Sequence, residues 1–291
     1  MRPVWFLTLL AGLLAACAPT AEPRIASPPL WRISDGDTTL YLLGAIHLLP
    51  RDVAWQGGRT GAAIERADLL ILEVANIADR RDQVARFRAL SRADRPLPPL
   101  RDRVAPTLRP ALAERLGALR GTNPGDLDTM KTWGAAVTLG ATQAAAQGAT
   151  VEAGVDTVLA QRFTQAAKPI TGLETADRQF EAFDGLSEEA QRHMLEQALR
   201  GGGDPAGGYG ALLEAWSAGN DTAIATITAR ELSPELAQKL LFDRNARWRD
   251  QLATRMTRPG VVLVAVGAAH LAGPHGVPAM LAARGFRVER L

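Results

Sequence analysis

Two aliphatic runs in this chain each end in the pattern Gly-x-x-His. They are TLYLLGAIH at residues 39–47 and VVLVAVGAAH at residues 261–270. Each run has the length and composition of a buried β-strand. Ligands of α/β proteins bind beyond the carboxyl ends of the sheet strands. If the two strands are neighbours, His47 and His270 therefore lie side by side in one site.

Carboxylates stand near the ends of two further strand-like runs. Glu73 ends an aliphatic run at residues 67–74, and a short strand predicted at residues 168–171 leads to Glu174. A carboxylate buried in an aliphatic run is strongly destabilising unless it is paired, so we expect a cationic or metal partner for Glu73. Glu174 either orients a substrate or caps the segment that begins at Thr175.

The order of strand-like and helical segments predicts an α/β fold. We expect a mixed central β-sheet with the two Gly-x-x-His strands adjacent and helices on both faces. An Asp-Gly turn at residues 35–37 is predicted to join an antiparallel hairpin. Residues 80–147 read as a helical insertion, broken by proline-rich turns, that covers the strand ends. Asp156 is predicted to be the N-cap of a helix at residues 157–167, and the glycine-rich residues 201–210 are predicted to be a linker.

The N-terminus has the pattern of a targeting segment. Arg2 precedes a short apolar stretch that ends in Leu-Ala-Ala before Cys17, which resembles a bacterial lipoprotein signal. The expected organisation is a signal peptide at residues 1–17, a flexible tether at 18–30 and one domain at 31–291. Similarity to Gram-negative lipoproteins favours lipidation of Cys17 and anchoring in the outer membrane, facing the periplasm. A plain secretory peptide with an incidental cysteine is the alternative.

The composition of the chain argues against several other classes of protein. The chain has 33 Lys and Arg against 31 Asp and Glu, and the basic residues are scattered, so no nucleic-acid partner is expected. Cys17 is the only cysteine, which excludes a disulfide and thiol chemistry in the mature domain. The hydrophobic content of 47% over 291 residues suits one large domain or two small ones.

The main candidate site consists of His47, Glu73 and His270. Two imidazoles and a carboxylate suit a divalent transition metal with positions open for water or substrate. Water bound to such a metal becomes a nucleophile near neutral pH. The same residues could instead act as general acid and base without a metal. Either histidine alone could also be a hydrogen-bonded structural residue.

Three further residues are candidates for supporting roles. His275 is either an additional ligand or a loop residue, and the Gly-Pro-His-Gly context favours the loop. Arg244 and Asn245 either bind an oxygen of a substrate or pair with Glu235 or Asp243.

Several segments together resemble the TraB/GumN family, which includes the Tiki proteins. The resemblance covers residues 31–291 and rests on the motifs LYLLGAIHLLP, LLILEV, EAGVDTVLAQRFTQAAKPITGLET, LFDRNARW and VLVAVGAAHLAGPHGVPAMLAARGFRVERL. It implies a core fold shared with Tiki proteases, erythromycin esterases and ChaN-like haem-binding lipoproteins. In Tiki proteins, two Gly-x-x-His histidines and a glutamate form a metal-dependent proteolytic site supported by manganese or cobalt. The matching residues here are His47, His270 and Glu73.

The resulting expectation is a lipid-anchored, metal-dependent hydrolase, most similar to a peptidase, that acts on a peptide or protein. His47 and His270 would bind Mn, Co or Zn, Glu73 would be a ligand or a base, and Glu174 and Arg244 would orient the substrate. The alternatives are a lipoprotein that binds haem or another ligand without turnover and a metal-free esterase-like enzyme. The oligomeric state stays open.

Overall fold

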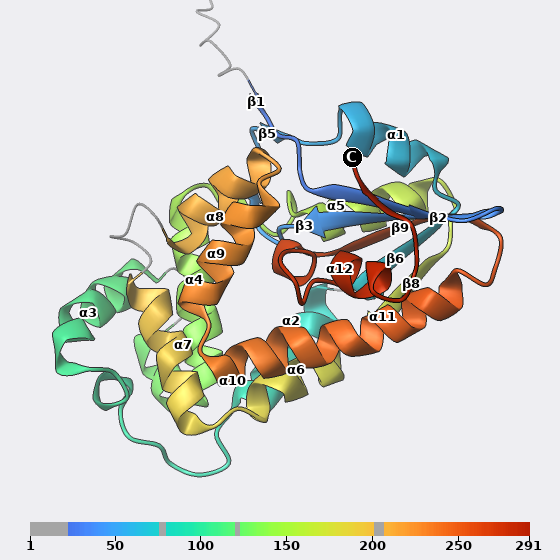
Figure 1. Cartoon of the computed structure of the whole chain (residues 1–291). Helices are drawn as coiled ribbons and strands as arrows, with labels where there is room; N and C mark the ends of the chain where they lie inside the picture. The colour runs from blue at the N-terminus through green and yellow to red at the C-terminus, as the bar shows by residue number, and fades with distance from the viewer. Residues whose placement is uncertain (1–22, 76–79, 120–122, 201–206) are drawn as a thin grey trace, which may run out of the picture.

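A mixed sheet lies at the centre of the molecule (Figure 1). The structure is a computed structural model that describes residues 23–75, 80–119, 123–200 and 207–291. The sheet has six strands in the order β10-β2-β3-β9-β6-β8. Their bounds are Val288–Arg290 (β10), Leu30–Ser34 (β2), Thr38–Ala45 (β3), Gly260–Gly267 (β9), Leu69–Val74 (β6) and Ile170–Glu174 (β8). The predicted α/β class and mixed sheet are confirmed.

The two Gly-x-x-His strands are neighbours. β3 and β9 pair in parallel along their whole length, with Ala45 opposite Gly267. The side chain of Asp35 accepts hydrogen bonds from the backbone N–H groups of Asp37 and Thr38, which closes the turn between the antiparallel strands β2 and β3. β9 also pairs in parallel with β6, and β6 pairs in parallel with β8. The predicted adjacency and the predicted hairpin are therefore both confirmed.

Helices cover both faces of the sheet because successive side chains of a strand point to opposite sides. Leu43 and Leu72 face α1 (Gly58–Arg66) and α5 (Val155–Gln165), within one hydrophobic core. Leu42, Val264 and Ile71 face α11 (Asp243–Arg255) and α12 (Val277–Ala282), within a second core.

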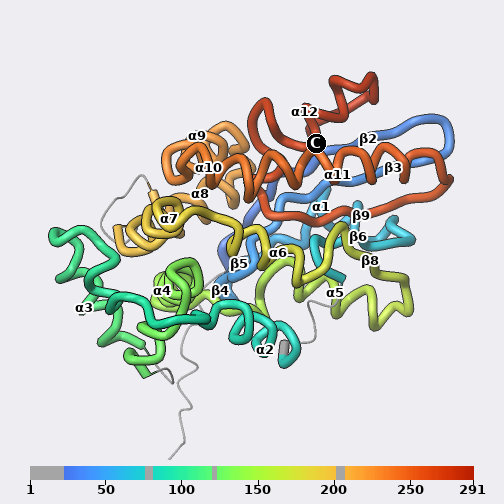
Figure 2. The backbone as a smooth tube through the Cα atoms, turned by 90° about the horizontal axis from the view of Figure 1, so that it is seen from below, coloured from blue at the N-terminus to red at the C-terminus, as the bar shows by residue number. Residues whose placement is uncertain are grey.

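A group of helices lies beyond the carboxyl ends of the parallel strands (Figures 1 and 2). It combines the predicted insertion with a second stretch of chain, because α4 packs against α7 along its length. Its helices are α2 (Arg80–Ser91), α3 (Arg109–Ala118), α4 (Thr132–Ala146), α6 (Ala176–Asp184), α7 (Glu188–Arg200), α8 (Gly208–Ser217), α9 (Asp221–Glu231) and α10 (Pro234–Ala237). The segment at residues 80–147 is thus one half of this helical layer, and the sequence did not indicate that the helices of the other half join it.

The segment before the sheet is more ordered than predicted. β1 (Arg24–Ile25) pairs with β5 (Val53–Ala54), and the N–H of Ser27 donates to the carbonyl of Ser217. The prediction of a flexible tether at residues 18–30 is therefore wrong from Arg24 onward, since backbone hydrogen bonds fix this segment on the domain. Two further short strands, β4 (Leu49–Pro50) and β7 (Ala149–Thr150), pair with each other.

Three predictions fall partly or wholly outside the described residues. These are the signal peptide with Cys17, the first part of the tether, and residues 201–206 of the predicted linker. Gly208 is described, and it begins α8 rather than continuing a linker. Within the described ranges, no helix combines the length and apolar character that crossing a bilayer requires.

Gly154 packs closely against the loop that carries His47, and replacing it should destabilise the protein. A Cβ atom at this position would lie 2.0 Å from the carbonyl oxygen of His47, and the neighbouring N–H of Val155 donates to the carbonyl of Ile46. We expect Gly154→Ala to lower the free energy of unfolding by about 1–3 kcal/mol, because the loop after β3 must move away from α5. Urea unfolding measures this change.

Gly36→Ala is the matched control, because nothing lies within 4 Å of a Cβ atom at that turn position. Equal unfolding midpoints for the two variants would show that the close packing of Gly154 against the carbonyl of His47 does not limit stability.

Candidate functional site at the strand ends

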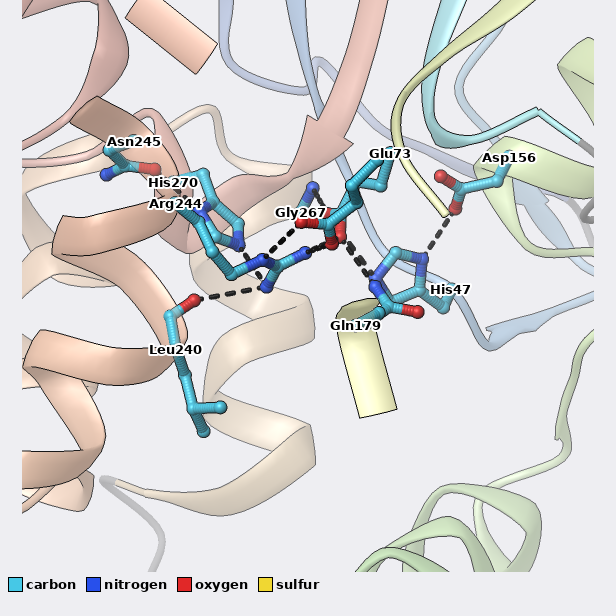
Figure 3. Close-up of polar contacts among 10 residues, drawn as sticks. His47, Glu73, Asp156, Gln179, Leu240, Arg244, Asn245, Gly267 and His270 are labelled. Atoms are coloured by element: carbon cyan, nitrogen blue, oxygen red, sulfur yellow. Dashed lines mark hydrogen bonds and ion pairs between the residues drawn. The ribbon is translucent and has the colours of Figure 1, made fainter. Parts of the chain in front are cut away.

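Four parallel strands, β3, β9, β6 and β8, end at one edge of the sheet. His47 and His270 follow the ends of β3 and β9, whereas Glu73 and Glu174 lie within the last two residues of β6 and β8. The strand predicted at residues 168–171 begins two residues later, at Ile170, so Glu174 is its last residue and not a residue beyond it. Figure 3 shows His47, Glu73 and His270 pointing toward one another.

Arg244 lies at the centre of this cluster. Its Nη2 donates to Glu73 Oε2 at 2.5 Å and to Glu174 Oε1 at 2.6 Å, and its Nη1 lies 3.1 Å from His270 Nε2. The guanidinium is also 4.6 Å from the centre of the Trp248 ring, a cation–π contact. The cationic partner expected for Glu73 is therefore Arg244.

The alternative pairing of Arg244 with Glu235 or Asp243 is wrong. Glu235 accepts hydrogen bonds from Ser187, and Asp243 accepts one from Gln238. Both carboxylates thus accept from exposed donors outside the buried cluster.

Both oxygens of Glu73 are engaged. Oε1 accepts from the N–H of Gly267 at 2.7 Å, and Oε2 accepts from Gln179 Nε2 at 2.9 Å as well as from Arg244. Burial would raise the pKa of Glu73, but Arg244 and the two imidazoles outweigh it and hold this pKa well below its usual range. Glu73 is thus ionised at neutral pH.

Gly267 allows the three principal side chains to approach one another. A Cβ atom at this position would lie 3.2 Å from Glu73 Oε1, 3.5 Å from His270 Cδ2 and 3.7 Å from His47 Nε2. The glycine of the second Gly-x-x-His pattern is therefore needed for close packing around the site and not only to end the strand.

His47 forms a pair with Asp156 that the sequence did not predict. Its Nδ1 lies 2.7 Å from Asp156 Oδ2, and its Nε2 lies 3.9 Å from Glu73 Oε1. The Asp156 carboxylate raises the pKa of His47 to about 9, against the opposing effect of burial. The side chain of His47 remains 49% exposed, so this ring is the part of the cluster that solvent and ligands can reach.

The prediction that Asp156 caps a helix is wrong. Gly154 is the N-cap of α5 and makes no side-chain cap, which leaves the Asp156 carboxylate in the first turn for His47. The two residues are 109 positions apart, and no local pattern in the sequence connects them.

His270 has a different environment from His47. It is only 4% exposed and packs on Trp248, with ring centroids 4.4 Å apart. Arg244 can only donate, so His270 Nε2 accepts, and Nδ1 carries the proton that it donates to Asn245 Oδ1 at 2.6 Å. Burial lowers the pKa of His270 to about 3, so the ring is neutral at neutral pH.

His275 stays outside the cluster, which confirms its interpretation as a loop residue. It is exposed, its carbonyl accepts from Asn245 Nδ2, and its ring packs on Phe242. Asn245 therefore joins this loop to His270 through both atoms of its side-chain amide.

A π-helical segment, Gln238–Phe242, precedes α11 directly. The helical stretch that runs from Pro234 to Arg255 is thus interrupted at this point. The wider turn places Leu241 in the cavity wall and lets the carbonyl of Leu240 accept from Arg244 Nη1 at 3.1 Å. Such π-helical turns occur frequently at functional sites.

The expected metal does not fit this arrangement of donors. Within the part of the chain that the structure describes, no group of three or more His, Cys, Asp or Glu side chains is placed to hold a metal ion. Glu73 already accepts three hydrogen bonds, and Arg244 occupies the position facing His270 Nε2. A divalent ion would require the Arg244 guanidinium to withdraw.

A cavity of about 500 Å³ opens above the strand ends. Its polar end is formed by His47, Asp156, Glu73, Arg244 and His270, and most of its remaining wall is apolar. A pocket with few convergent polar groups in an apolar wall is the usual form of a small-molecule or catalytic site.

Comparison with known proteins agrees with the sequence motifs. The sequence model described as the TraB/PrgY/gumN family matches residues 29–290. The chain is 29% identical over 246 residues to the uncharacterized protein YbaP of Escherichia coli (strain K12), covering 84% of this chain and 89% of that relative. YbaP of Shigella flexneri matches with the same identity and coverage. No solved structure matches the chain.

Removing the central cation should destabilise the protein strongly. We expect Arg244→Met to lower the free energy of unfolding by about 3–5 kcal/mol, because Glu73 and Glu174 would remain buried without a positive partner. Arg192→Met, which breaks an exposed ion pair with Glu188 on α7, is the control and should change it by about 0–1 kcal/mol. Urea unfolding measures both, and equal values would contradict the central role of Arg244.

Proposed function

The chain belongs to the TraB/PrgY/gumN family, and from this premise we propose that it is a hydrolase whose catalytic centre is the cluster at the strand ends. The observation that carries the proposal is the pair formed by His47 and Asp156. His47 is half exposed in the cavity, and its Nδ1 is held by a buried carboxylate at 2.7 Å. An imidazole fixed in this way by a carboxylate is the usual general base of hydrolytic sites.

The proposed reaction is attack of water on the carbonyl carbon of an ester or amide. Neutral His47 accepts a proton at Nε2 from the water, whose oxygen bonds to the carbonyl carbon. Asp156 stabilises the resulting imidazolium, as its effect on the pKa of His47 indicates. The tetrahedral intermediate then collapses, and the imidazolium returns its proton to the departing alcohol or amine.

Arg244 and His270 fix the polar end of the cavity beside His47. Arg244 lines the cavity, and Glu73 and Glu174 hold its guanidinium in place. All five N–H groups of this guanidinium are engaged within the protein, so Arg244 holds the polar end of the cavity in place and keeps no free donor for the substrate oxygen. His270, neutral and anchored by Asn245, accepts from Arg244 and restrains its orientation. Glu73 is a positioning residue in this arrangement, because its oxygens are occupied.

A metal-dependent peptidase is the second candidate, and one observation favours it. Both imidazoles turn Nε2 toward the cluster and hold Nδ1 on an oxygen, from Asp156 for His47 and from Asn245 for His270. Metal-binding histidines are usually oriented in this way. In this alternative the Arg244 guanidinium would withdraw from Glu73 and His270. His47, His270 and Glu73 would then hold Mn, Co or Zn, which would supply an activated water.

The remaining predictions concern ligand and location. Haem binding without turnover stays an alternative for the same cavity, with His47 as the accessible imidazole. Titration with haemin tests it, because axial ligation gives a new Soret band that His47→Ala should lose. The predicted lipid anchor at Cys17 would hold the enzyme at a membrane of the cell envelope.

The pH dependence of hydrolysis should report the state of His47. A general base must be neutral, so kcat/KM should rise with pH and level off above about 9, where His47 loses its proton. In Asp156→Asn the charge that raises this pKa is gone, so the rise should move to lower pH. The maximal rate should fall by roughly 10²–10⁴-fold.

Asp250→Asn is the control, because Asp250 pairs with Arg249 and Arg284 on the surface. It should leave the pH profile unchanged. A wild-type profile that falls as pH rises through 9 would make His47 a general acid and reject the proposed role.

Metal analysis separates the two candidate mechanisms. We expect wild-type protein to keep its activity after exhaustive dialysis against a chelator, and to bind no stoichiometric Mn, Co or Zn in equilibrium dialysis. Binding in wild type that is lost in both His47→Ala and Glu73→Ala would instead establish the metal-dependent alternative. Circular dichroism of each variant checks that the fold is retained.

A further inference from the structure

The cavity above the strand ends has two chemically distinct halves. Its polar groups lie together at the sheet edge, while its apolar wall comes from helices of the helical layer. Val137 of α4, Phe180 and Phe183 of α6, Leu212 of α8 and Leu241 of the π-helical segment form this wall. The lining is predominantly apolar despite the charged cluster at its base.

The aromatic part of this wall is held in place by packing. Phe180 and Phe183 both stack on Trp133, with ring centroids 6.2 and 5.7 Å apart. Trp133 is fully buried, and its Nε1 donates to Asp184 at 3.1 Å. Because these rings have fixed neighbours, the apolar half of the cavity is formed before any ligand arrives.

The charges in the cavity are already paired. Arg244 is the single Arg or Lys among the described residues that line it, and two carboxylates hold its guanidinium. His47, the other cationic group, is paired with Asp156. A carboxylate or phosphate of a substrate would therefore find no unpaired cation and would lie close to three buried carboxylates.

We propose that the cavity selects an uncharged ester or amide whose acyl part is an apolar chain. The chain would lie along the wall formed by α4, α6 and α8, with its carbonyl at the polar end beside His47. This inference rests on the proposed hydrolase function, since it assigns the substrate class of the same site. The apolar wall supplies affinity, and the paired charges exclude anionic acyl groups.

A series of p-nitrophenyl esters from acetate to decanoate tests the proposal. We expect kcat/KM to rise about fourfold for each added methylene until the chain fills the cavity. The p-nitrophenyl half-ester of suberic acid has a chain of similar length with a terminal carboxylate. It should react roughly a hundredfold more slowly than the octanoate ester, because the cavity would have to bury its charge.

Leu212→Trp tests the assignment of the wall. The added ring would shorten the apolar half, so the ratio of the decanoate rate to the acetate rate should fall at least tenfold. Val137→Phe narrows the wall from α4 and is the second variant if the first does not fold. Ile25→Trp is the control, because Ile25 is 77% exposed and does not line the cavity, and it should keep the wild-type ratio.

Binding of the uncharged apolar dye N-phenyl-1-naphthylamine tests the apolar binding site separately from the hydrolase activity. Dye binding that weakens in Leu212→Trp, without hydrolysis of any ester or peptide, would support the apolar site and reject the hydrolase. Hydrolysis that is independent of chain length and equally fast for the charged half-ester would reject the apolar site and leave the hydrolase intact. Loss of the chain-length effect in Ile25→Trp would also overturn the assignment of the wall.

Discussion

The buried contact of Arg244 with Glu73 and Glu174 is the interaction on which the strand-end site depends. The two carboxylates come from the ends of adjacent strands, β6 and β8, and the guanidinium comes from α11 on one face of the sheet. None of these three charges is stable in the interior alone, so each fixes the position of the others. Through Nη1 the same guanidinium also orients His270, and through Glu73 it reaches the backbone of Gly267. The Arg244 cation thus links the sheet, α11 and the strand-end site.

The two Gly-x-x-His histidines show how position alone can give one residue type two roles. Both follow neighbouring parallel strands and both hold Nδ1 on an oxygen atom. The partner of His47 is a carboxylate and its ring is half exposed, which favours the charged form. The partner of His270 is an amide, its ring is buried, and a guanidinium faces its Nε2, which favours the neutral form. The first imidazole can therefore exchange a proton with a ligand, while the second serves as a fixed acceptor.

Local patterns in the sequence were sufficient for the individual core strands but not for the full strand order or for the site. The aliphatic runs predicted β3, β9 and β6 as buried strands, and the carboxylate within β6 predicted a cationic or metal partner for Glu73, because strand length, burial and charge are local properties. The adjacency of β3 and β9 was an assumption from the repeated pattern that the structure confirms. Two of the contacts that build the polar cluster, His47 with Asp156 and Glu73 with Gln179, join residues more than a hundred positions apart, and nothing local specifies them. The tether was misjudged for a related reason. Its composition suits a flexible segment, but the partners that order it, such as Ser217, come from distant parts of the chain.

The position of β9 in the sheet constrains when the protein can complete its folding during synthesis. This strand lies between β3 and β6, although it is made almost two hundred residues after β6. β3 and β6 therefore cannot take their final places until nearly the whole polypeptide has been synthesised. Arg244 and His270 also belong to this late part of the chain. A nascent or truncated chain that lacks this segment consequently holds the Glu73 carboxylate without Arg244 and without the N–H of Gly267. The buried polar cluster is complete only when the last segment arrives.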